Sequence, residues 1–226
     1  MVGKVESRSW RFVVGILVVL GTSGRATLLF GQTGPVQGLE PRLNLTIQVC
    51  SNTRISKRTL DEAKEEAGRI LRQSEVETVW LDCRPEGEKA QTQPGASQAT
   101  RQYFSLVILK QALPERRLHD ETLGFAVPCP ELDGPCRAFV FYPRVRQLAA
   151  ESNVSTNLIL GHVMAHELGH LLLGSYHAPA GIMQAKWDRQ DLQRAFWKIL
   201  GFTPQQRELI RAKILMRKEA AQVSSR

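Results

Sequence analysis

The chain has 226 residues, enough for one sizeable domain or two small ones. Hydrophobic residues make up 42% and charged residues 23% of the sequence, as in ordinary globular proteins. The formal net charge is +8, of which residues 1–30 contribute +3, and no dense Lys/Arg block is interleaved with aromatic residues. This moderately basic composition argues against a nucleic-acid partner.

The N-terminal segment has the form of a secretory signal. A basic stretch precedes the apolar run Phe12–Leu20, which is too short to span a bilayer comfortably. We therefore expect residues 1–30 to be a signal peptide, with an uncleaved membrane anchor as the alternative. Residues 31–42, rich in Gly, Pro and Gln, follow as a linker. The rest of the chain is then secreted, or lies in the periplasm or cell envelope of a bacterium.

Four cysteines fit an exported chain, because an even count suggests disulfide bonds. Cys129 and Cys136 flank a turn-rich loop, and Cys50 and Cys83 end two predicted strands that could be neighbours. The sequence has no C-x-x-C pair, which argues against a cysteine zinc site. We predict two disulfides among three possible connectivities, with Cys129–Cys136 as the local pair.

The predicted elements of the domain, residues 43–216, begin with a strand and a helix. Residues 43–50 alternate apolar and polar side chains, and residues 56–73 carry apolar side chains at helical spacing. Residues 103–110 are almost continuously apolar, which is typical of a central strand covered on both faces. Further strands are predicted at 78–83, 123–128 (an edge strand) and 137–143, and further helices at 157–173, 188–200 and 203 to about 216, before a tail at 217–226.

This order predicts an α+β fold. We expect a mixed, twisted β-sheet with one backing helix, a long buried helix at 157–173 and a mostly helical C-terminal part. The aromatic side chains Trp187, Phe196 and Trp197 near the start of that part are expected to belong to the core.

The long buried helix carries the motif H-E-L-G-H. His166 and His170 are four residues apart, so on a helix they project from one face and can bind a single metal ion. Glu167 can take a proton from a metal-activated water. A buried helix would not carry these ionisable side chains without partners, because their burial is costly. The motif therefore predicts a Zn²⁺ site on the active-site helix, with Glu167 as the general base.

A tetrahedral catalytic zinc site needs a third protein ligand and keeps one position open. Gly174 can end the helix and turn the chain back, which would let His177 reach the metal. Asp188 and Asp191, at the start of the next predicted helix, are the alternative ligands. His162 lies one helical turn too early to share the ion, and we expect it to be a packed or supporting side chain.

The segment from His166 to Met183 resembles the signature of the metzincin metallopeptidases, H-E-x-x-H-x-x-G-x-x-H followed by a Met-containing turn. The residues that match in kind and order are His166, Glu167, His170, Gly174 and His177, with G-I-M at 181–183 in place of the Met-turn. One residue more than in the family pattern separates His170 from Gly174. That residue would rotate the glycine by about 100° and could displace His177.

The resemblance implies a metzincin-like fold in which Met183 forms a hydrophobic floor beneath the metal. It also implies that an extended peptide could pair with the strand that precedes the active-site helix, A-F-V-F-Y at 138–142. We therefore predict an exported, monomeric zinc metallopeptidase that acts on peptides or proteins. The alternatives are a non-catalytic zinc-stabilised binding module and a zinc hydrolase of a non-peptide amide. Glu167 argues against the first, because a structural zinc site has no use for that carboxylate.

Overall fold

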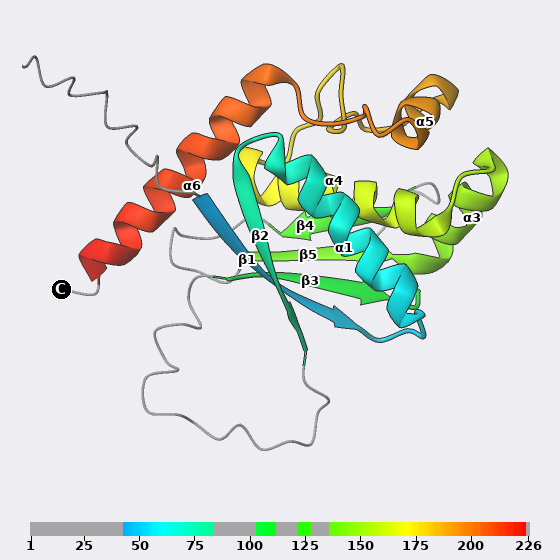
Figure 1. The fold of residues 1–226 in the computed structure, drawn as a ribbon, viewed down its shortest axis with the longest axis horizontal. Coiled ribbons are helices and arrows are strands. Elements are labelled where there is room, and N and C mark those ends of the chain that lie inside the picture. The colour runs from blue at the N-terminus through cyan, green and yellow to red at the C-terminus, as the bar shows by residue number, and fades with distance from the viewer. Residues whose placement is uncertain (1–42, 84–102, 112–121, 128–135, 225–226) are drawn as a thin grey trace, which may run out of the picture. The chain divides into compact units, whose positions relative to one another are not determined.

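The computed structural model describes residues 43–83, 103–111, 122–127 and 136–224 (Figure 1). The strands are β1 (Leu43–Ser51), β2 (Val76–Asp82), β3 (Tyr103–Leu109), β4 (Gly124–Val127) and β5 (Cys136–Phe141). The helices are α1 (Lys57–Arg72), α3 (Tyr142–Ser152), α4 (Thr156–Leu173), α5 (Arg189–Phe196) and α6 (Pro204–Ser224). The expected signal peptide, the linker and Cys129 lie outside the described residues. Within them, no helix is long and apolar enough to cross a membrane.

The strands form one mixed sheet in the order β2-β1-β3-β5-β4, which confirms the predicted fold class. Only β4 runs antiparallel to its neighbour, β5; the other pairs are parallel. Helix α1 supplies the crossover that the parallel strands β1 and β2 require. The strand expected at an edge, at 123–128, is β4, which ends the described sheet. The expectation that 138–142 would pair with a peptide is wrong, because β5 lies between β3 and β4 and both of its edges are occupied.

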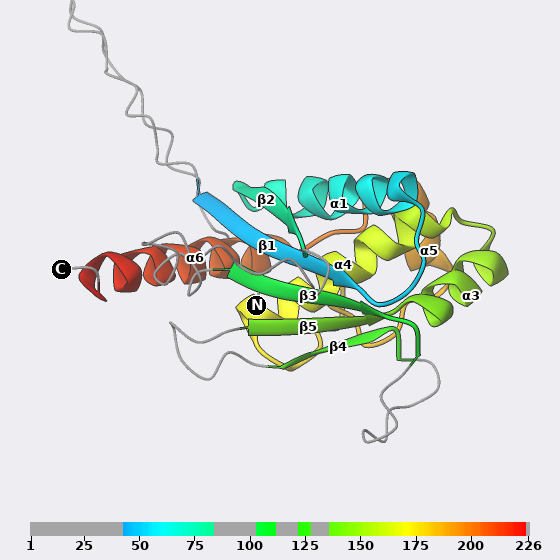
Figure 2. The same cartoon turned by 90° about the horizontal axis from the view of Figure 1, so that it is seen from below.

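Helices α1 and α4 lie side by side on one face of the sheet (Figures 1 and 2). Gly161 of α4 permits this approach, because a Cβ atom there would lie 2.8 Å from the carbonyl oxygen of Ala63 in α1. In β3, Phe104, Leu106 and Ile108 are buried on this face, whereas on the other face Leu109 is buried but Ser105 and Val107 are only half-buried. The strand is central as expected, but it is not equally covered on both sides.

The helix boundaries differ from the sequence prediction at three places. Helix α3 was not predicted, since it starts directly after β5 without a capping side chain, and Pro143 stands in its first turn. Helix α5 is shorter than the predicted 188–200, because Lys198 has a positive φ of 58° that ends it. Helix α6 continues to Ser224, well past the predicted end near Met216.

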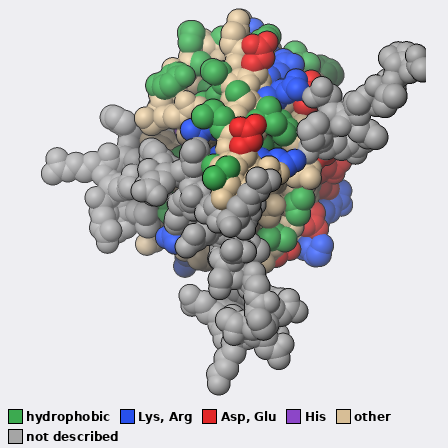
Figure 3. All heavy atoms as spheres, turned by 90° about the vertical axis from the view of Figure 1, so that its left-hand side faces the viewer, with side chains coloured by type: hydrophobic (Ala, Val, Ile, Leu, Met, Phe, Trp, Pro, Cys, Tyr) green, Lys and Arg blue, Asp and Glu red, His purple; other side chains and the backbone are tan. Residues whose placement is uncertain are grey.

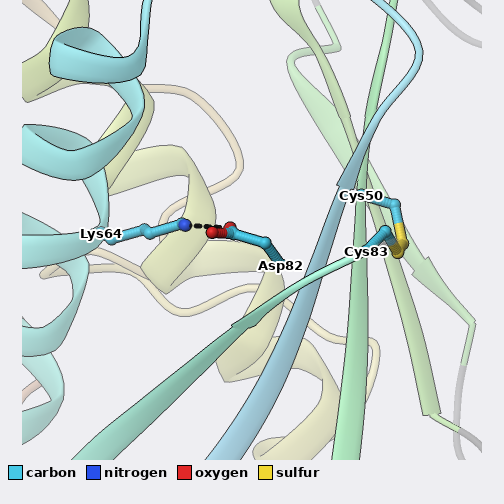
Figure 4. The surroundings of a disulfide bond; sticks show 4 residues. All are labelled: Cys50, Lys64, Asp82 and Cys83. Carbon is cyan, nitrogen blue, oxygen red and sulfur yellow. Dashed lines mark hydrogen bonds and ion pairs between the residues drawn. A yellow bond between two sulfur atoms is a disulfide. The ribbon is translucent and has the colours of Figure 1, made fainter. Parts of the chain in front are cut away.

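A disulfide joins Cys50 and Cys83 at the ends of β1 and β2 (Figure 4). The pairing across neighbouring strands is as expected, and the backbone N–H of Cys83 donates to the carbonyl of Val49 at 2.9 Å. Beside it, the largely buried Lys64 of α1 forms an ion pair with Asp82 at the end of β2. The ends of β1 and β2 are thus held to each other by a covalent bond and to α1 by an ion pair. The Cys129–Cys136 pair stays a prediction, since Cys129 is outside the described residues.

Candidate metal centre

Helix α4 places the motif inside the protein, because every residue from Leu158 to Leu172 is buried. The rings of His166 and His170 project from the same face, with centroids 4.7 Å apart and nearly perpendicular planes. The apolar residues of the helix pack into the main core, including Leu160, Met164 and Leu168. The two histidines are therefore held by a helix that has little freedom to move.

His177 joins these two side chains through the chain reversal that follows α4. Gly174 caps the helix with a positive φ of 101°, a conformation that favours glycine. Three residues later, the Nε2 atom of His177 lies 3.2 Å from the Nε2 atom of His170. One ring nitrogen from each of His166, His170 and His177 lies within 4.8 Å of the other two. The extra residue before Gly174 thus lengthens the helix, and His177 still lies next to His166 and His170.

Backbone carbonyls fix the orientation of the two helical histidines. The Nδ1 atom of His166 lies 2.7 Å from the carbonyl oxygen of Ile182, and that of His170 lies 2.9 Å from the carbonyl oxygen of Gly174. A carbonyl only accepts hydrogen bonds, so in each ring Nδ1 carries the hydrogen and donates. In a neutral ring this leaves the Nε2 lone pair directed away from the carbonyl, as in histidines that bind metals.

Burial keeps these imidazoles in the neutral form that binds metals. Removal from water lowers the pKa of His166 to about 3, although its hydrogen bond to Ile182 acts in the opposite direction. Burial also lowers the pKa of His170 below its ordinary value. Both rings are therefore uncharged at neutral pH, and no proton has to leave before a cation binds.

The three histidines suit zinc. Neutral imidazole nitrogens bind Zn²⁺ at about 2.0–2.1 Å, and two of them on one tetrahedral ion are about 3.3 Å apart. The 3.2 Å between the Nε2 atoms of His170 and His177 is close to that separation. Three protein ligands also leave a fourth position open, as catalytic zinc sites do.

A tight turn beneath the histidines contains Met183, which is 1% exposed. A Cβ atom on Gly169 of α4 would lie 2.5 Å from the Sδ atom of Met183, so only glycine at that position lets the methionine pack this closely under the motif. The same turn supplies the Ile182 carbonyl that orients His166. The turn thus supports the histidine site both through packing and through a hydrogen bond.

Glu167 lies beside this group but is not one of the three candidate ligands. Its side chain is 3% exposed, and its Oε2 atom has no hydrogen-bond partner in the described part of the chain. Burial raises the pKa of Glu167 to about 8. A buried oxygen without a partner costs stability, so proteins keep one chiefly where function requires it.

All four side chains line one cleft of about 970 Å³. The edge strand β4 contributes Gly124, Phe125 and Ala126 to its wall, and helix α3 contributes further side chains. Trp187, which we expected in the core, is half-buried and also lines this cleft. Its Nε1 atom donates to the same Ile182 carbonyl at 3.1 Å and therefore supports the turn under the motif.

The other predicted candidates lie elsewhere. Asp188 caps the N-terminus of α5 by accepting from the backbone N–H of Asp191. The Asp191 carboxylate accepts from the backbone of Asp188 and from Arg194, so both aspartates serve the helix rather than the histidine group. His162 is fully buried, as expected for a packed side chain. Tyr176 is exposed.

Sequence reasoning missed the role of Gly124 in β4. A Cβ atom on this residue would lie 2.6 Å from the Oε1 atom of Glu167 and 2.4 Å from the carbonyl oxygen of Phe139, so only glycine fits between the carboxylate and β5. A glycine inside a predicted strand often marks such a close approach. That signal was present in L-G-F-A-V at 123–127.

The chain was compared with known proteins. No family model and no curated protein matches it. Among solved structures, it is similar to the crystal structure of archaemetzincin from Methanopyrus kandleri. The two chains are 18% identical, the alignment covers 78% of this chain and 99% of that chain, and the TM-score is 0.45.

Proposed function

We propose that this protein is an exported zinc-dependent peptidase in which His166, His170 and His177 hold the ion and Glu167 is the general base. The observation that carries the proposal is that three imidazoles meet beside a buried carboxylate with an unpartnered oxygen, all in one cleft. The Cys50–Cys83 disulfide and the apolar N-terminal segment support export.

Strand β4 supplies a binding edge for the substrate. It lies at the end of the described sheet, and its residues also line the cleft. An extended peptide pairs with this edge through backbone hydrogen bonds. The pairing holds the scissile bond next to Glu167, which lies directly behind Gly124.

The chemistry divides between the ion and the chain. A zinc ion held by the three histidines would polarise the scissile carbonyl and make a water molecule more acidic. Glu167 takes a proton from the attacking water and returns it to the leaving amine. Its apolar surroundings make its carboxylate more basic than that of an ordinary glutamate, which suits proton transfer near neutral pH.

Glu167→Gln tests the proposal against a purely structural zinc site. The variant should keep its zinc and its thermal stability while peptide hydrolysis falls by about 10²–10⁴-fold, since the proton carrier is lost. Glu151→Gln is the matched control, because Glu151 of α3 lines the same cleft but is exposed. The proposal fails if Glu167→Gln hydrolyses a mixture of unstructured peptides as fast as the unchanged chain.

A further inference from the structure

The C-terminal end of α5 exposes three large hydrophobic side chains within four residues. Phe196, Trp197 and Ile199 are 52%, 69% and 68% exposed. No other four consecutive positions of the described chain hold three large hydrophobic side chains that are exposed. We call residues 196–199 the α5 tip. An apolar cluster of this kind marks a surface that something other than water covers.

The local structure explains why these side chains point outward, although Phe196 and Trp197 were expected in the core. Helix α5 turns Leu192 and Ala195 toward the protein, so the next two positions fall off that face. The positive φ of Lys198 then reverses the chain, and Leu200 returns to the core with Ile199 left outside. The ring centroids of Phe196 and Trp197 are 5.1 Å apart in an edge-to-face contact, an arrangement that aromatic pairs favour.

The α5 tip carries one charged side chain, which is positive. This is the exposed Lys198, whereas Arg194, one helical turn earlier and 53% exposed, is paired with Asp191 at 3.2 Å. The acidic residues of this segment, Asp188 and Asp191, lie at the opposite end of α5, where they form its capping box. The tip therefore combines an apolar surface with one cationic side chain, Lys198, and carries no acidic residue.

We propose that the α5 tip docks on an anionic lipid surface. Phe196, Trp197 and Ile199 enter the boundary between headgroups and acyl chains, where Trp is favoured, while Lys198 contacts the headgroups. A lipid surface fits better than a protein partner, because a specific protein interface takes about 20–30 residues a side and the tip has four. Docking would hold the candidate metal centre near a membrane, since α5 follows directly on the cleft residue Trp187.

Vesicle binding of the full chain tests this inference. Binding to mixed phosphatidylcholine–phosphatidylglycerol vesicles should fall at least about ten-fold in Phe196→Ser/Trp197→Ser/Ile199→Ser. The matched control is Leu209→Ser/Met216→Ser/Val223→Ser, which removes three hydrophobic side chains of α6 that are 53%, 53% and 75% exposed. On the side of the molecule at the C-terminal end of α6, hydrophobic side chains are interspersed with acidic and basic ones (Figure 3). The α6 variant should bind as the unchanged chain does.

Two further variants test how much the positive charge of Lys198 contributes to vesicle binding. Lys198→Gln should lower binding to the anionic vesicles about five-fold and leave binding to pure phosphatidylcholine unchanged, whereas Lys218→Gln on α6 should change neither. Because the N-terminal apolar segment is the same in all variants, its own lipid binding cancels in each comparison.

Brominated lipids give a signal that is specific to position 197, because they quench the fluorescence of Trp side chains near the acyl chains. In a chain that carries Trp10→Phe, they should quench Trp fluorescence, and most of this quenching should disappear when Trp197→Phe is added. The inference is overturned if the α5 tip variant binds vesicles as the unchanged chain does. It is equally overturned if the unchanged chain self-associates without lipid and the α5 tip variant loses this self-association alone, since a second copy of the chain is then the partner. The inference would also be overturned if the unchanged chain bound a protein partner through the α5 tip and bound no vesicles.

Discussion

Gly124 of β4 and Glu167 of α4 touch so closely that a methyl group between them would lie 2.6 Å from the carboxylate oxygen Oε1. The same methyl group would lie 2.4 Å from the carbonyl oxygen of Phe139, so Gly124→Ala should shift β4 as well as the carboxylate and lower kcat for peptide hydrolysis by about a hundredfold, as small misplacements of catalytic groups do. Zinc content should not change, because the atoms nearest to the added methyl group belong to Phe139 and Glu167 and not to the three histidines. Gly68→Ala is the control: a Cβ atom there would lie 2.8 Å from Thr78 Oγ1, far from the cleft. Equal activity losses in the two variants would show a general packing effect instead.

The third metal ligand can be decided by metal analysis. His177→Ala should lose most of its bound zinc, because two imidazoles alone leave the ion under-coordinated. Asp188→Ala should keep one zinc per chain and instead lose about 1 kcal/mol of stability, since it removes the cap of α5. Zinc analysis after gel filtration, together with chemical denaturation, separates the two effects. Normal zinc in His177→Ala with loss in Asp188→Ala or Asp191→Ala would reverse the assignment.

Stability should decrease at acidic pH because of His162. Burial lowers the pKa of His162 below its ordinary value of 6.5, and Nδ1 donates to the Leu158 carbonyl at 2.9 Å. Its Nε2 atom lies 3.7 Å from Glu66 Oε1, and that carboxylate is paired with Arg69. As the pH falls, His162 takes up a proton in the unfolded chain before it does so in the folded protein. The contribution of neutral His162 to the free energy of unfolding is therefore complete above about pH 6.5 and is lost as pH falls through its folded-state pKa.

His162→Leu measures this contribution. Below about pH 6.5 the free energy of unfolding should fall more steeply in the unchanged chain than in the variant. The difference should be up to about 1.4 kcal/mol per pH unit, because one proton is involved. Titration of His166, His170 and Glu167 is common to both chains and cancels in the difference. Denaturant unfolding from about pH 7 to about pH 5 gives the two slopes. Parallel slopes would mean that His162 does not titrate differently in the folded protein.

The Cys50–Cys83 disulfide should contribute strongly to stability. It closes a loop with a sequence separation of 33, and the chain-entropy relation gives about 3–4 kcal/mol for that length. Cys50→Ser/Cys83→Ser should lower the unfolding free energy by this amount without abolishing zinc binding, because the bond lies at the ends of β1 and β2. Denaturant titration of the oxidised proteins measures it. An unchanged midpoint would show that Lys64–Asp82 and the strand pairing hold this end without the bond.

Much of the fold was readable from local patterns. The alternation in β1, the helical spacing in α1 and the long apolar run of α4 each reflect how one segment buries one face, and they were predicted at nearly the right residues. Helix α3 was missed, because its start has no capping side chain and the preceding strand signal runs into Pro143. The outward position of Phe196 and Trp197 was missed for a different reason. It depends on which face of α5 packs against the rest of the protein, and that face is the one with Leu192 and Ala195.

For the candidate site, the sequence by itself determined that His166 and His170 share one helical face with Glu167 beside them, because helix geometry alone fixes that arrangement. Only the tertiary structure decided that His177, and neither Asp188 nor Asp191, comes within reach, since this depends on the path of the chain after Gly174. It also brought Gly124 against Glu167, from a strand more than forty residues earlier. Spacing along one helix is a local property, whereas contacts between segments depend on how the sheet, α4 and the following turn pack together.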